Sequence, residues 1–198
     1  MLDTQTVNAK RHAIAETDDV WLFGYGSLIY KVDFPYLEKR PARLSGWARR
    51  FWQGSHDHRG TIENPGRVLT LIRDRSSVCF GMAYRVKGAT FSHLDHREKN
   101  GYLRHEVKIT WVDQQQSNWQ QNSQVAIVYQ ADEHNAAYLG PQSERAIAQQ
   151  ILSSEGPSGP NREYLFRLAD ALRSLGEQDE HVFAIEAAAY ELLKNMNQ

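Results

Sequence analysis

Over the first two thirds of the chain, hydrophobic residues either alternate with polar ones or form short apolar runs. This spacing predicts β-strands, because successive side chains of a strand point to opposite faces. The expected strands span residues 20–25, 42–52, 67–72, 78–86, 102–112 and 125–129. The polar residues 73–77 (RDRSS) predict the turn of an antiparallel hairpin between the third and fourth of these strands.

Beyond Pro141 the hydrophobic period lengthens to about 3.6 residues, which is the period of an α-helix. Apolar positions between Ile147 and Leu192 fall into groups that predict three C-terminal helices. A further short helix is expected over residues 90–98, since Gly101 follows as a stop signal. Strands followed by helices predict an α+β fold on an antiparallel, barrel-like sheet.

The domain organisation predicted from this pattern is simple. Residues 1–19 are polar and of mixed charge, without the apolar run of a signal peptide or a membrane span. We expect an N-terminal arm here, as a short helix or a frayed segment, and nothing in it suggests chemistry. Residues 20–198 contain no repeat and no linker, and they predict a single domain with its own core.

Charge and cysteine content narrow the classes of partner and compartment. The formal net charge is -1, with 23 Lys and Arg residues against 24 Asp and Glu residues, so no global field attracts nucleic acid or an anionic membrane. Cys79 is the single cysteine, which excludes an intrachain disulfide. A reducing compartment, the cytoplasm, is therefore expected.

The turn after the first strand, residues 23–28 (FGYGSL), is a candidate cradle for a carboxylate or an oxyanion, because glycines expose main-chain amides. A turn with a purely structural role fits the same residues. Ser27 does not fit a nucleophile elbow, because Ile29 stands where that pattern requires glycine. Cys79 lies within a predicted strand and is expected to be an inert buried thiol.

Histidine and carboxylate side chains suggest two further chemistries. His56, His58, His93 and His96 are possible metal ligands, but their spacing matches no known zinc signature. Glu98 ends the short helix expected over residues 90–98. The residues alone leave open whether it is a solvated acid at a helix end or a general base that points into a cavity.

Seven blocks of the sequence, taken together and in this order, resemble the ChaC family of glutathione-specific γ-glutamylcyclotransferases. The resemblance covers about Val20 to Lys194, and its blocks are FGYGSLIYKVDFP, RRFWQGSHDHRG, PGRVLTL, GMAYRV, HREKNGY, YLGP and GPSGPNREYLF. It implies a small β-barrel with flanking helices, which agrees with the order of predicted strands and helices.

The same resemblance implies the site residues. The family's Y-G-S-L loop falls on residues 25–28, and its R-E-x-x-G-Y motif falls on Arg97, Glu98, Gly101 and Tyr102, so that Glu98 inherits the role of catalytic acid and base. Arg50 is a candidate contact for a substrate carboxylate, and Tyr138 a candidate to close the pocket. The predicted substrate-binding residues are Leu22, Phe23, Gly24, Tyr25, Gly26, Ser27, Leu28, Arg50, Tyr102 and Tyr138.

The activity implied by the resemblance is cleavage of reduced glutathione to 5-oxoproline and Cys-Gly. Neither a metal nor an organic cofactor is expected, and the protein is expected to be a monomer or a weak dimer without nucleic-acid or membrane partners. Three alternatives stay open: a cyclotransferase for other γ-glutamyl amines or amino acids, a noncatalytic binding protein of the same fold, and a metal hydrolase.

Overall fold

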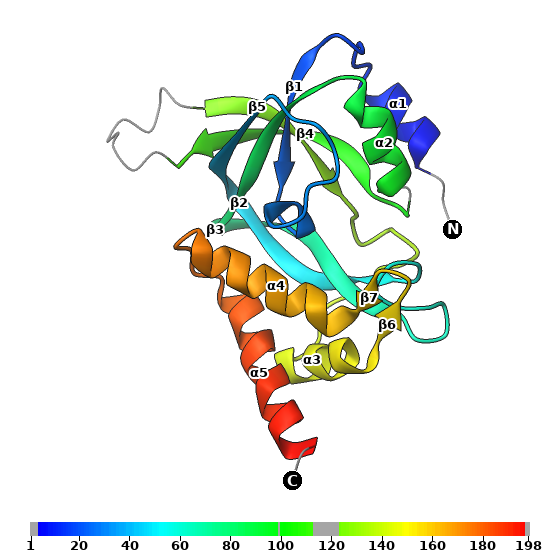
Figure 1. Cartoon of the computed structure of the whole chain (residues 1–198), viewed down its shortest axis with the longest axis vertical. Helices are drawn as coiled ribbons and strands as arrows, with labels where there is room; N and C mark the ends of the chain where they lie inside the picture. The colour runs from blue at the N-terminus through cyan, green and yellow to red at the C-terminus, as the bar shows by residue number, and fades with distance from the viewer. Residues whose placement is uncertain (1–3, 99, 113–122, 197–198) are drawn as a thin grey trace. The chain divides into compact units, whose positions relative to one another are not determined.

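The computed structural model describes residues 4–98, 100–112 and 123–196. Five strands form a closed barrel in the order β1-β3-β2-β4-β5 (Figure 1). Their bounds are Asp19–Gly24 (β1), Glu38–Ser55 (β2), Gly66–Lys87 (β3), Leu103–Trp111 (β4) and Ser123–Gln130 (β5). The pairs β1/β3, β2/β4 and β4/β5 are antiparallel, and β1 meets β5 in parallel where Leu22 is opposite Ile127. The predicted α+β fold with a small antiparallel barrel is confirmed.

Residue contacts divide the structure into two compact units. The first consists of the described residues within 1–48 and 71–136, and the second of those within 49–70 and 137–198. The long strands β2 and β3 each contribute residues to both units. The single domain expected over residues 20–198 stays a prediction.

A hydrophobic cluster in the first unit joins strands of the barrel to a helix that packs against them. Leu22 of β1, Tyr84 of β3 and Ile127 of β5 are buried there. Helix α2 (Thr90–Arg97) buries Phe91 and Leu94 in the same cluster, since these residues lie three positions apart on one helix face. Helix α1 (Gln5–Arg11) contacts α2 and β4, and Figure 1 shows α1 beside α2.

The second unit contains the three predicted C-terminal helices, which are confirmed as α3 (Glu144–Ser153), α4 (Asn161–Ser174) and α5 (Glu180–Met196). The two-residue strands β6 (Glu155–Gly156) and β7 (Gly159–Pro160) lie between α3 and α4. Buried Arg67 joins distant segments, because its guanidinium donates to the carbonyls of Phe51 and Gly140, each at 2.9 Å.

The turn predicted over residues 73–77 is wrong, because these residues continue the extended strand β3 from Gly66 to Lys87. Within this stretch, Asp74 accepts hydrogen bonds from the amide and the hydroxyl of Ser76, at 3.1 and 2.7 Å. Arg73 and Arg75 are exposed. Solvent exposure therefore explains the polar run that looked like a turn.

Candidate active site

The loop after β1 is folded back against the barrel as a short 3-10 helix, η1 (Ser27–Ile29). Leu28 of this helix is 8% exposed and belongs to the hydrophobic cluster of the first unit. A Cβ atom on Gly24 would lie 2.5 Å from the Leu28 Cβ, so only glycine permits this close return of the chain. The glycine between Phe23 and Tyr25 thus has a steric purpose.

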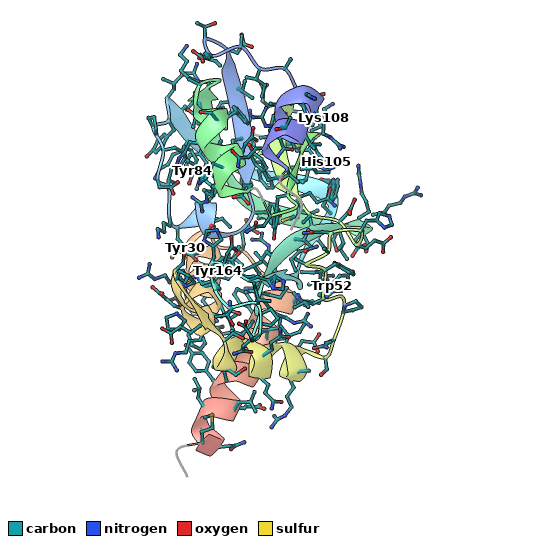
Figure 2. All side chains as sticks on the ribbon, turned by 90° about the vertical axis from the view of Figure 1, so that its right-hand side faces the viewer. Tyr30, Trp52, Tyr84, His105, Lys108 and Tyr164 are labelled. Carbon is teal, nitrogen blue, oxygen red and sulfur yellow. The ribbon has the colours of Figure 1, made fainter. Side chains whose placement is uncertain are left out.

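Tyrosine hydroxyls anchor the same loop. Tyr84 of β3, labelled in Figure 2, donates to the Leu28 carbonyl at 2.6 Å. Burial, together with the neighbouring Tyr36, raises the pKa of Tyr84 to about 12, so the hydroxyl keeps the proton that it donates. Tyr25 is buried and donates to the Tyr129 carbonyl at 2.9 Å. Its side chain therefore holds the loop on β5.

Gly26 and Ser27 leave main chain and one hydroxyl of this loop partly exposed. Gly26 and Ser27 are half-buried, whereas their neighbours Tyr25 and Leu28 are buried. In a 3-10 helix each amide bonds three residues back, so the first intrahelical donor here is the Ile29 amide, which bonds the Gly26 carbonyl at 3.0 Å. The amides of Gly26, Ser27 and Leu28 have no partner inside this helix, and such amides suit an anion.

Glu98 follows α2 directly as its C-terminal cap. Its amide donates to the Leu94 carbonyl at 2.9 Å, and its side chain is 23% exposed and can therefore be reached from solvent. The chain leaves this helix end through Gly101, where φ is +93° and where a Cβ atom would lie 2.3 Å from the Asn135 side chain. Both constraints require glycine three residues after Glu98.

Arg97 brings the two motifs together. Its Nη2 donates to Ser27 Oγ at 2.8 Å, and its Nε lies 3.5 Å from Glu98 Oε1. Its Nη1 bonds Asp33 Oδ1 at 2.7 Å. One half-buried guanidinium thus joins the loop hydroxyl and the glutamate carboxylate. Arg97 belongs to the R-E-x-x-G-Y motif, and no pattern along the chain shows that it reaches Ser27.

A buried polar network also binds the C-terminal part of α2. Arg104 of β4 binds Asp95 of α2 through two bonds, Nε to Oδ1 at 2.9 Å and Nη2 to Oδ2 at 2.5 Å. The Tyr129 hydroxyl donates to Asp95 Oδ1 at 2.6 Å. Burial is the larger cause, and the Asp95 carboxylate the smaller one, of a raised pKa of Tyr129. Asp95 lies three residues before Glu98, so the network holds the turn that carries the glutamate.

The remaining predicted contacts fall into two groups. Leu22 and Phe23 are each 1% exposed and pack in the core, while Tyr102 is half-buried against the hydrophobic cluster. Arg50 and Tyr138 belong to the second unit, where Arg50 is half-buried and Tyr138 is opposite Gln53 in an isolated bridge. Substrate binding by these five residues stays a prediction.

The other candidate chemistries have the following surroundings. Cys79 is 2% exposed, as expected of an inert buried thiol. His93 and His96 are exposed on α2. Within residues 4–98, 100–112 and 123–196, no three His, Cys, Asp or Glu side chains are grouped as metal ligands would be.

Comparison with known proteins identifies the family. The sequence model of ChaC-like proteins matches residues 20–192. The chain is 43% identical over 182 residues to glutathione-specific gamma-glutamylcyclotransferase 1 of Mus musculus, covering 88% of this chain and 79% of that protein. It is 37% identical over 187 residues to glutathione-specific gamma-glutamylcyclotransferase of Schizosaccharomyces pombe, covering 85% and 91% of the two chains.

Solved structures show the same relationship. A crystal structure described as a gamma-glutamyl cyclotransferase specific to glutathione, from yeast, matches with a TM-score of 0.79 and 31% identity. The match covers 87% of this chain and 96% of the yeast chain. The resemblance of the seven sequence blocks is thereby confirmed, and the chain belongs to the family of ChaC-like proteins.

Proposed function

We propose that this protein is an enzyme that cleaves reduced glutathione by intramolecular cyclisation, giving 5-oxoproline and Cys-Gly. The observation that carries the proposal is the contact of Arg97 with both Ser27 and Glu98, because it joins the candidate anion cradle to the candidate proton acceptor. The relatives from mouse and fission yeast, which are named for this activity, support the same reaction.

The first step forms the ring. Glu98 accepts a proton from the substrate α-ammonium, and the free amine attacks the γ-carbonyl carbon of the same glutamyl group. Both reacting groups belong to one chain, so attack closes a five-membered ring without an outside nucleophile. Intramolecular reactions of this kind reach effective molarities on the order of 10⁵ M or more when the groups are well oriented.

The second step breaks the original amide bond. The tetrahedral intermediate collapses, the C–N bond to the cysteine residue cleaves, and Glu98 returns its proton to the departing nitrogen, which would otherwise leave as a poor anion. The second proton, which the attacking nitrogen still carries after ring closure, passes through the same carboxylate to the nitrogen of Cys-Gly. Overall, two protons pass from the α-ammonium nitrogen to the nitrogen of Cys-Gly. The reaction consumes no water and transfers no electrons, so as written it needs neither a metal nor an organic cofactor.

The loop after β1 has the role of binding charge. We assign to the amides of Gly26, Ser27 and Leu28 either the substrate α-carboxylate or the oxyanion of the intermediate, and loss of one such donor costs about 10² in rate. Gly24 and Tyr25 hold the loop in place. The proposal keeps Leu22, Phe23, Tyr102, Arg50 and Tyr138 as further substrate contacts.

The setting of the reaction is also part of the proposal. Among the helices of the described residues, none combines the length and the apolar character that crossing a membrane requires. We place the enzyme in the cytoplasm, because its single cysteine cannot form an intrachain disulfide. The proposal keeps a monomer or weak dimer as its assembly.

The test is product analysis in water enriched in ¹⁸O. Purified protein with reduced glutathione should yield 5-oxoproline without ¹⁸O and an equal amount of Cys-Gly, measured by mass spectrometry. Glutamate carrying ¹⁸O would instead show hydrolysis and contradict the proposal. Faster conversion of γ-glutamyl amino acids than of glutathione would correct the substrate to the broader class of γ-glutamyl compounds.

A further inference from the structure

The N-terminal helix α1 is bound to the segment that carries Glu98, although the family match begins only at residue 20. Thr4 and Asn8 lie four positions apart and therefore share one face of this helix. Both side chains are 0% exposed. Buried polar side chains need hydrogen-bond partners, and these two find theirs in the main chain between Glu98 and Arg104.

The Asn8 side chain binds the main chain at the start of β4 through one acceptor and one donor, as a peptide group would. Its Oδ1 accepts from the Arg104 amide at 2.9 Å, and its Nδ2 donates to the Tyr102 carbonyl at 3.0 Å. One side-chain amide thus supplies an acceptor and a donor to the main chain on either side of Leu103. Aspartate lacks the donor and alanine lacks both groups, so this pair of bonds is specific to the amide side chain.

Thr4 binds the main chain of Glu98 itself. It occupies the N-cap position of α1, where a threonine oxygen ordinarily accepts a bond from its own helix, yet no such capping bond forms. The Thr4 hydroxyl instead donates to the Glu98 carbonyl at 3.3 Å. The Thr4 side chain therefore binds Glu98, the residue proposed to transfer protons, and does not cap its own helix.

The chain after α1 adds two contacts to the same strand. Arg104 Nη1 donates to the His12 carbonyl at 3.1 Å, while Arg11 Nη2 lies 3.3 Å from Nδ1 of His105, which is labelled in Figure 2. Arg104 also binds Asp95, so the contacts of α1 and the buried network meet on one strand. Glu98 is therefore held between α2 before it and β4 after it.

We infer that α1 is a positioning element for the reaction, in which Asn8 and Thr4 act through the main chain to fix Glu98. This inference rests on the proposed function. Neither side chain is proposed to touch the substrate, so their loss should lower kcat and leave KM within about threefold. Displacements of about 1 Å from such distant changes can cost up to 10²-fold in rate.

The variants follow from the two sets of bonds. We expect Asn8→Ala in the full chain to lower kcat about 10-fold or more, and Asn8→Asp to lower it as well, because the donor to Tyr102 is lost. Thr4→Val should lower kcat, whereas Thr4→Ser keeps the hydroxyl and should restore the wild-type rate. Lys10→Ala, on the exposed face of α1, is the matched control and should change nothing.

The double variant Asn8→Ala/Glu98→Gln distinguishes an effect of Asn8 through Glu98 from a purely structural role of Asn8. If Asn8 acts through Glu98, the double variant should lose no more than about twofold beyond Glu98→Gln alone. Equal losses in both backgrounds would overturn the inference, as would an unchanged kcat for both Asn8→Ala and Thr4→Val.

Hydrogen exchange at the Arg104 amide gives a readout independent of activity. Protection should fall in Asn8→Ala and persist in Asn8→Asp, which keeps the acceptor. Unchanged protection in Asn8→Ala would contradict the proposed hold of Asn8 on the Arg104 amide. A wild-type protein that forms no 5-oxoproline would contradict the proposed function together with this inference. An active wild type in which Asn8→Ala and Thr4→Val both keep the wild-type kcat would contradict the inference and leave the proposed function intact.

Discussion

Asp95 and Arg104 form a buried ion pair in the first unit. Their side chains are 6% and 4% exposed, so each charge has lost most of its water. The two direct bonds between them, with the Tyr129 hydroxyl on the same carboxylate, compensate that loss. The pair is costly to break, since removal of one partner leaves the other charge buried alone.

Replacement of Asp95 tests whether burial makes its ion pair with Arg104 costly to break. Asp95→Asn should lower the free energy of unfolding by about 3 kcal/mol, measured by urea unfolding at pH 7. Asp170→Asn is the control, because Asp170 pairs with Arg173 at 3.4 Å while its side chain is 78% exposed; its loss should stay below about 1 kcal/mol. Equal losses in the two variants would show that burial does not set the cost.

Elements of the second unit are joined through a histidine. His181 of α5 accepts a hydrogen bond at Nε2 from the Phe51 amide of β2, at 3.1 Å, which requires an unprotonated nitrogen. Burial, with a further contribution from Arg50, lowers the pKa of His181 from 6.5 to about 4. Between these two pH values the unfolded chain binds a proton that the folded chain does not, so stability falls as the pH decreases from about 6.5 to about 4.

His181→Gln removes this titration and keeps an oxygen that can accept from the Phe51 amide. Wild-type protein should lose more stability than the variant between pH 7 and pH 4, by up to about 3 kcal/mol. Urea unfolding of both proteins at several pH values measures the difference. Parallel stability curves would show that the buried histidine is not responsible.

Some strands and helices could be predicted from the sequence and others could not. The strands β1, β4 and β5 and the helices after Pro141 were predictable, because a local hydrophobic period marks a half-buried strand or helix. The polar residues 73–77 were misinterpreted, since an exposed stretch of strand and a turn share the same composition. Helix η1 and the pair β6/β7 are too short to carry a period.

Across the whole molecule, the candidate site depends on contacts between residues far apart in the chain. Resemblance to the ChaC family pointed to Glu98 and to the loop of residues 25–28. It did not reveal that Arg97 reaches Ser27 or that Asn8 reaches Arg104, contacts that span 70 and 96 positions. Such partners are set by how strands and helices pack, and no spacing along the sequence encodes them.

The rate of 5-oxoproline formation by Glu98→Gln at saturating glutathione tests most directly whether this carboxylate transfers the protons. The substitution keeps the size of the side chain and removes the proton acceptor, so kcat should fall by about 10² to 10⁴ while the melting temperature stays the same. Glu133→Gln, at an exposed position, should keep the wild-type rate. A folded Glu98→Gln variant that retains more than about a tenth of the wild-type kcat would contradict the assignment.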